Sequence, residues 1–98
     1  MQKQAQRTSK TTPAVVAKDA LAKEIGRVIS DRGMTQNQVS RLTGEQQSQI
    51  SLVVTRKLHG ISVSRLFRIL NGLGRDIEIR IAGAKRGRGR VRLNVSPS

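Results

Sequence analysis

Residues 34–51 read MTQNQVSRLTGEQQSQIS and carry the clearest helix signals in the chain. Thr35 and Gln38 stand three residues apart, the spacing of a capping box, in which each side chain bonds a backbone N–H group left free at a helix start. A short helix is therefore predicted from Gln36 onward. It is predicted to end before Gly44, because glycine supplies the backbone freedom that a tight turn into the next helix needs.

The helix after this turn opens on amide and hydroxyl side chains and carries no carboxylate after Glu45. Such a face suits the base edges and phosphates of DNA better than it suits plain solvent. Two short helices joined by a tight turn form a helix-turn-helix, which lays its second helix in the major groove. The apolar residues predicted to face inward across the turn are Val39, Leu42, Ile50 and Val53.

On these residues the chain resembles the XRE class of lambda-repressor-like and Cro-like DNA-binding domains. The shared features are TQxxVxxLTG, beginning at Thr35, and QxSQIS, beginning at Gln46, where that class has its recognition helix. Residues 56–81, RKLHGISVSRLFRILNGLGRDIEIRI, are similar to a narrower set, the HigA-type antitoxins of RelE-like RNase toxins. The resemblance covers residues 18–95. One departure is Arg56, at a position where many members have the glycine that ends the recognition helix.

Two further helices are predicted to flank the motif. The earlier one spans residues 13–31 with Thr12 as its cap, or starts later, at Asp19. The later one follows the cap Ser62 and ends at Gly74. Its buried stripe is predicted to consist of Val63, Leu66, Leu70, Leu73 and, as a core anchor, Phe67, which is the only aromatic residue in the chain.

The apolar pattern then changes to a period of two, which indicates strands. Two alternating runs are separated by the basic, glycine-rich segment AGAKRGRG, so a two-stranded β-hairpin is predicted over residues 75–98. An isolated hairpin is marginal in water, and its apolar rows therefore require the helices, a second subunit or another protein. The residues predicted to form this dimer or partner interface are Ile77, Ile79, Ile81, Val91, Leu93 and Val95.

The chain has 98 residues, which limits it to one small domain with a small core. Dimerisation is expected, because a second subunit would add buried surface. Nineteen Lys and Arg against six Asp and Glu give a net charge of +13, typical of a protein that meets nucleic acid or an acidic surface. Residues 1–12 are basic, lack apolar periodicity and are predicted to be a disordered tail. The chain has no Cys and no apolar run long enough for a membrane span, so a cytoplasmic, nucleoid-associated location is expected.

The sequence contains no set of side chains that suits catalysis or the binding of a cofactor. The single His59 lies in a predicted loop with no second ligand, and the carboxylates are scattered over helix and strand surfaces. The segment GAKRGRG precedes a strand rather than a helix, so it does not match a phosphate-binding loop. We therefore expect no catalytic residues, no metal and no cofactor.

The predicted site is a DNA interface with two kinds of contact. Gln amides pair well with adenine in the major groove, and helix N-termini and cations suit phosphates. The predicted base contacts are Gln46, Gln47, Ser48, Gln49 and Ser51. The predicted phosphate contacts are Gln36, Arg41, Arg56 and Lys57.

The sequence thus predicts a mainly α protein, with a lambda-repressor-like domain of about four helices over residues 13–74 and a C-terminal β-hairpin. Its predicted function is operator binding by a homodimer that represses its own promoter. The resemblance further implies an antitoxin that neutralises a RelE-like toxin. Two alternatives stay open: a phage or plasmid repressor without a toxin, and a basic module that binds proteins or RNA. The charge run over residues 85–92 fits DNA phosphates, an acidic partner or a solvated edge.

Overall fold

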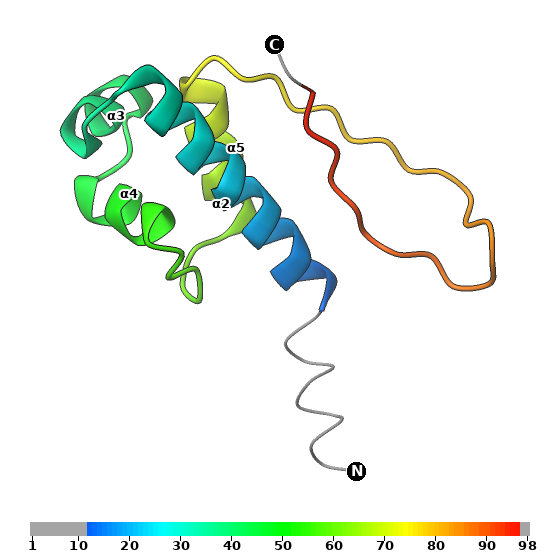
Figure 1. Ribbon diagram of the computed structural model, residues 1–98. Coiled ribbons are helices and arrows are strands. Elements are labelled where there is room, and N and C mark those ends of the chain that lie inside the picture. Colours follow the sequence, from blue (N-terminus) through cyan, green and yellow to red (C-terminus); the bar gives the residue numbers. More distant parts are fainter. Residues whose placement is uncertain (1–11, 97–98) are drawn as a thin grey trace.

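The computed structural model describes residues 12–96, which form four helices and a long extended segment (Figure 1). The helices are α2 (Pro13–Arg32), α3 (Gln36–Thr43), α4 (Gln47–Val54) and α5 (Val63–Gly72). The mainly helical fold is therefore confirmed. Residues 1–11, most of the tail predicted from the sequence, lie outside the described part of the chain.

Local capping explains where the first two helices begin and end. Thr12 Oγ1 accepts a hydrogen bond from the Val15 amide, and α2 stops where Gly33 adopts a left-handed backbone with φ of 60°. At α3, the Gln38 amide donates to Thr35 Oγ1 at 3.1 Å while the Thr35 amide donates to Gln38 Oε1 at 2.8 Å. Both bonds of the predicted capping box are present, so the start predicted for this helix is confirmed.

The core lies where α2 and α5 pack against the helix pair α3 and α4. Helix α2 contacts both α4 and α5, and α3 contacts both α4 and α5. Helices α2, α4 and α5 each contribute buried apolar residues at helical spacing, and α3 contributes Val39. Burial of these side chains removes apolar surface from water. The buried apolar residues are Leu21, Ala22, Ile25, Val28, Ile29, Val39, Ile50, Val53, Ile61, Leu66, Ile69, Leu70 and Leu73.

Three residues predicted to lie in the core are not fully buried, and one of them, Val63, is half-buried at its edge. Leu42 does not face inward but is 54% exposed. The inward position on this side of α3 belongs to Thr43, four residues after Val39, whose hydroxyl donates to the Val39 carbonyl at 2.7 Å. Phe67 is only half-buried at the edge of the core, whereas Ile69, absent from the predicted stripe, is fully buried.

The close approach of α3 and α5 explains the glycine near the end of α5. A Cβ atom built on Gly72 would lie 2.9 Å from both Cα and Cγ2 of Thr43. Any larger residue would force the two helices apart, because the nearest atom belongs to the backbone. Gly72 therefore sets the distance between α3 and α5.

The predicted β-hairpin is not present among residues 75–96. These residues form no strand, and no backbone–backbone hydrogen bond involves residues 76–96. The two runs leave the helices and return as an open loop (Figure 1). Of the predicted rows, Ile77 and Leu93 pack against the core, while Ile79, Ile81, Val91 and Val95 are exposed. A single chain has too little apolar surface on these runs to offset the entropy of ordering an isolated hairpin.

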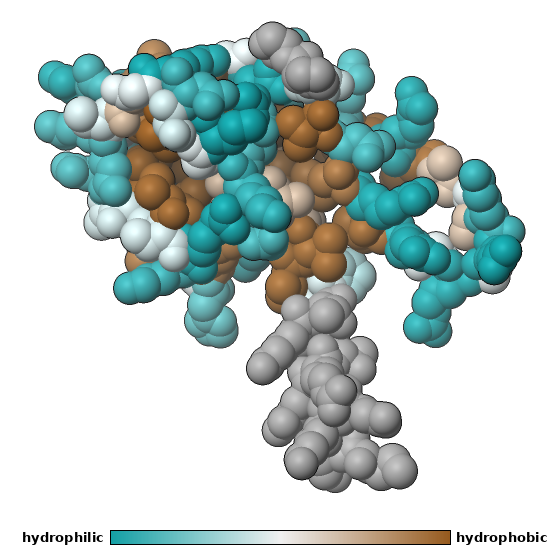
Figure 2. Space-filling view, in the orientation of Figure 1, coloured by the Kyte–Doolittle hydropathy of each residue, from teal (hydrophilic) through white to brown (hydrophobic). Residues whose placement is uncertain are grey.

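Charged side chains hold both ends of this extended segment on α2. Glu24, only 8% exposed, accepts two hydrogen bonds from Arg27, at 2.7 and 2.8 Å, and pairs with Arg75 at 3.4 Å. Arg75 in turn donates to the Ser96 carbonyl at 2.9 Å. Figure 2 shows apolar surface gathered along α2 beside the returning segment, whereas the far end of the loop is hydrophilic. The loop is therefore fixed at its base and free at its tip.

Candidate nucleic-acid interface

Helix α4 has one buried side and one polar side, which is the arrangement expected of a recognition helix. Ile50 and Val53 are fully buried. Because a helix turns once in 3.6 residues, Ser48 and Ser51 lie opposite this buried pair, with Gln47 to one side. Among the predicted base contacts, Gln46, Gln47 and Ser48 are exposed, and Gln49 and Ser51 are half-buried.

The start of α4 leaves its own backbone donors open. Gln46 occupies the cap position, but its side chain makes no capping hydrogen bond. The first N–H groups of α4 therefore lack the side-chain partner that Thr35 provides for α3. With no acidic residue in the first turn, these donors and the helix dipole favour an approaching anion such as a phosphate.

The turn before α4 is fixed by one carboxylate and two arginines. Glu45 pairs with Arg68 at 3.1 Å and with Arg65 at 3.6 Å, both on α5. On the other side, Ser40 donates from its hydroxyl to the Glu45 carbonyl at 2.6 Å. Helix α4 is thus held at a set angle to α3 and α5, which is what the positioning of its polar face requires.

The four predicted phosphate contacts lie at different places on the surface. Gln36 is half-buried in the first turn of α3, and Arg41 is exposed near the end of the same helix. Lys57 is exposed in the loop after α4. Arg56 also lies in this loop, but its guanidinium pairs with Asp19 of α2 at 3.3 Å. Its charge is therefore partly neutralised within the chain.

Arg56 also adopts an unusual backbone. Its φ of 62° makes it the one non-glycine residue with positive φ in the described part of the chain. This is the position where many XRE-class sequences have glycine, so the sequence departure coincides with a backbone conformation that disfavours side chains. Helix α4 still ends just before this residue, at Val54, and the Lys57 amide donates to the Leu52 carbonyl at 2.8 Å across the helix end.

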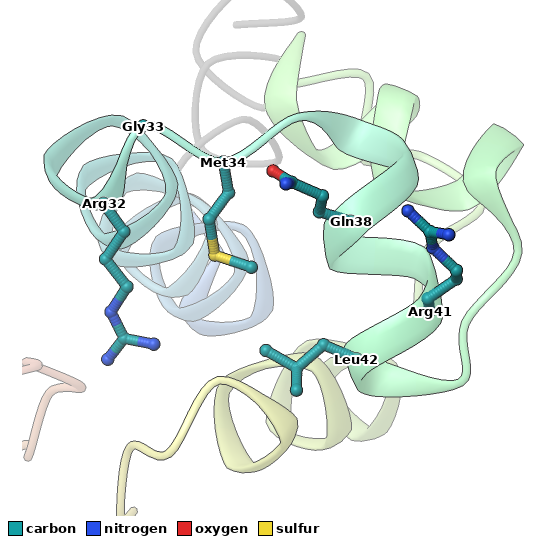
Figure 3. Close-up of a pocket in the computed structure, with 6 residues that line it drawn as sticks. All are labelled: Arg32, Gly33, Met34, Gln38, Arg41 and Leu42. Carbon is teal, nitrogen blue, oxygen red and sulfur yellow. The ribbon is translucent and has the colours of Figure 1, made fainter.

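A shallow hollow of about 510 Å³ lies between the end of α2 and the outer face of α3. Figure 3 shows Met34 and Leu42 directed toward it, with Arg32 at its rim and Gln38 above. The exposed Leu42 thus lines a surface hollow instead of the core. Gln38 is engaged in the capping box.

Comparison with known proteins places this geometry in a family. Residues 6–82 match the family described as "Helix-turn-helix domain". A solved structure described as "Putative XRE Family Transcriptional Regulator" is 33% identical, with a TM-score of 0.71, over 84% of this chain and 92% of that chain. The chain belongs to the XRE family of helix-turn-helix proteins. A search of curated proteins finds no significant match.

The helix-turn-helix predicted over residues 34–51 is confirmed: it consists of α3 and α4, joined by the turn that begins at Gly44. Within residues 12–96 no group of His, Cys, Asp or Glu side chains could hold a metal ion. No helix in the same part of the chain has the length and apolar content to cross a bilayer.

The sequence did not reveal the residues that position α4. Glu45, Arg65 and Arg68 are charged residues on polar surfaces, and nothing local distinguishes them from solvated side chains. A partial signal was available, because Arg65 and Arg68 stand three residues apart on one side of a predicted helix. Their shared partner, about 20 residues earlier, becomes apparent only when α3 and α5 are packed together.

Proposed function

We propose that this protein is a DNA-binding transcriptional regulator that recognises a specific operator and represses its own promoter as a homodimer. The observation that carries the proposal is the polar, acid-free first turn of α4, exposed opposite the buried Ile50 and Val53 and fixed by Glu45. Membership of the XRE family, and the likeness to a structure described as a transcriptional regulator, support it.

In this proposal, Gln47 reads a base edge and the other polar residues of the first turn assist it. A Gln amide forms a bidentate pair with adenine, and a good bidentate pair contributes about 1–3 kcal/mol of discrimination. Gln47 is exposed at the start of α4 and carries no hydrogen bond to another described residue. Its amide is therefore free to meet DNA.

The experiment is footprinting of the DNA upstream of the protein's own gene, followed by titration of the protected site. Gln47→Ala is expected to weaken binding to that site by about 1–3 kcal/mol and to leave binding to random DNA unchanged. Asn94→Ala is the matched control, because it truncates an exposed amide outside the helices. Equal losses on both DNAs would remove Gln47 from base recognition, and absence of any protected site would refute the operator function.

A second candidate role is that of antitoxin to a RelE-like toxin. The support comes from the C-terminal segment, where residues 78–92 are all exposed and carry six cations, among them Arg86, Arg88 and Arg90. An exposed segment that combines cations with apolar residues suits a protein partner that covers it.

This role is tested with the product of a toxin-sized open reading frame adjacent to the gene. Co-expression with the full chain is expected to restore growth, and purification is expected to yield a stoichiometric complex. A chain that lacks residues 78–92 should lose the complex but keep the helices. Growth inhibition that the full chain does not relieve would refute the antitoxin role and leave the operator function standing.

A further inference from the structure

The segment 77–81 has no backbone partner among residues 12–96. It is extended and exposed at its centre, with Ile79 73% and Ile81 93% exposed. No backbone–backbone hydrogen bond involves it, although it alternates apolar and charged residues as strands do. Its base is anchored, since Ile77 packs against the core and Arg75 pairs with Glu24. A strand edge of this kind is open to pairing with another chain.

We propose that residues 77–81 pair with the same residues of a second copy of this chain, antiparallel, about a two-fold axis through Ile79. In this register Ile79 faces its own counterpart, Ile77 faces Ile81 of the second copy, and Glu78 faces Arg80 of the second copy. This inference rests on the homodimer in the proposed function and adds the register that joins the two subunits.

The charges select this register over its neighbours. An axis through Glu78 or Arg80 would place that residue opposite its own copy, so that like charges would face one another. A register centred between two residues would put isoleucines opposite charged residues on both faces. With the axis at Ile79, two Glu–Arg pairs form on one face and the three isoleucines of each chain lie together on the other.

The occupant is inferred to be a second copy because the segment is complementary to itself. Neither Glu78 nor Arg80 has a hydrogen bond or ion pair with another described residue, so both are available. A closed two-fold pair also satisfies each subunit with one shared interface. The residues after Gly83 are rich in glycine and cations, and like charges there would discourage extension of the pairing.

A disulfide scan tests the register, and the absence of Cys from the natural chain makes it clean. Directly opposed Cα atoms in an antiparallel pair are about 4.5–5.5 Å apart, within disulfide range. Ile79→Cys is therefore expected to give a covalent dimer under mild oxidation. Ile77→Cys and Ile81→Cys should each remain uncrosslinked alone, because each residue lies roughly 13 Å from its own copy, but should crosslink when mixed.

A charge swap tests the same register without oxidation. Glu78→Arg and Arg80→Glu each place two like-charge pairs in the interface, so sedimentation should show the dimer dissociation constant rising roughly tenfold in each. The double variant Glu78→Arg/Arg80→Glu keeps the native net charge and should restore the dimer. An equimolar mixture of the two single variants should restore it as well. Circular dichroism checks that the helices are intact.

The outcomes separate this inference from the proposed function. Failure of Ile79→Cys to crosslink, or equal crosslinking in all three single variants, would overturn the register. A double charge variant that dimerises no better than the single variants would also overturn it. If the wild-type chain protects promoter DNA but Ile79→Cys does not crosslink, the operator function stands and the register is wrong. If the cysteine variants crosslink as expected but the wild-type chain protects no DNA, the register stands and the operator function is refuted.

Discussion

At the scale of single residues, Arg56 has an unfavourable backbone conformation that its exposed ion pair with Asp19 offsets only in part. A left-handed φ costs a non-glycine residue about 1 kcal/mol, and its exposed ion pair with Asp19 returns only a fraction of that. Arg56 is therefore expected to cost the fold more free energy than its ion pair supplies.

Arg56→Gly is expected to stabilise the protein for this reason. The gain should be about 0.5–1 kcal/mol, equivalent to roughly 2–8 °C in melting temperature for a domain of this size. Arg56→Ala is the matched control, because it also removes the ion pair but keeps the strained backbone, and it should lower the melting temperature slightly. Thermal unfolding followed by circular dichroism measures both. A melting temperature of Arg56→Gly below that of Arg56→Ala would contradict the strain argument.

Glu24 links the stability of the fold to pH. The hydrogen bonds from Arg27 hold the pKa of the Glu24 carboxyl below its usual value, although burial acts in the opposite direction. A carboxyl with a lowered folded pKa stabilises the protein above its unfolded pKa of about 4.3 and loses that contribution as pH falls through the folded value. Ionised Glu24 also holds Arg75 at the base of the C-terminal segment.

We therefore expect Glu24→Gln to lower the melting temperature at pH 7, and we expect its difference from the wild type to shrink as pH falls below about 4.3, the unfolded pKa of Glu. Asp76→Asn is the control, because Asp76 is exposed and has no ion pair with another described residue, and it should leave the melting temperature unchanged at each pH. The comparison uses the melting curves of the wild type and of both variants, measured at each pH. A difference between Glu24→Gln and wild type that stayed constant with pH would show that the carboxylate charge is not what stabilises.

At the scale of elements, two glycines inside helices have opposite roles. Gly72 of α5 lies against Thr43 of α3, with 2.9 Å from an added Cβ to the Thr43 backbone. Gly26 of α2 has no atom within 4 Å of the same position, so its glycine is not required by packing. The sequence alone offered no way to distinguish the two positions.

Gly72→Ala should destabilise the protein by about 1–3 kcal/mol, because the added methyl group overpacks the contact between α3 and α5. Gly26→Ala should stabilise it by about 1 kcal/mol, because alanine favours a helix interior and finds free space. Urea unfolding of the two variants beside the wild type measures both signs. Because α3 belongs to the helix-turn-helix, Gly72→Ala should also weaken operator binding. Stabilisation by both substitutions would show that α3 and α5 tolerate separation.

Elements whose determinants are local could be predicted from the sequence. The start of α3 rests on Thr35 and Gln38, and the end of α2 on Gly33, so residues a few positions apart were sufficient. The same holds for the polar first turn of α4. Which helices pack together could not be predicted from the sequence. This packing determines the exposure of Leu42 and Phe67 and brings Glu45 to its two arginine partners. The predicted hairpin was wrong because a period of two shows that a run can form a strand, but not whether pairing the two runs offsets the entropy of ordering them.

At the scale of the whole molecule, two groups of exposed cations lie in separate regions. Arg41 and Lys57 are exposed on the helices and loops of the helix-turn-helix unit. Lys85, Arg86, Arg88 and Arg90 lie at the tip of the C-terminal loop, which Figure 1 shows on the opposite side of α2 from α4. Helix α4 and the tip of the loop of the same subunit are therefore separated by α2.

Salt dependence of operator binding should distinguish these regions, because the slope of log K against log salt changes by about 0.9 for each phosphate neutralised. Arg41→Ala should reduce the slope by about one unit. The triple variant Arg86→Gln/Arg88→Gln/Arg90→Gln, although it removes three charges, should leave the slope nearly unchanged and should instead weaken any complex with a protein partner. A titration between 50 and 200 mM salt compares the two variants. A fall of two or three units in the triple variant would place the loop on the duplex, and its cations would then have to be assigned to DNA phosphates.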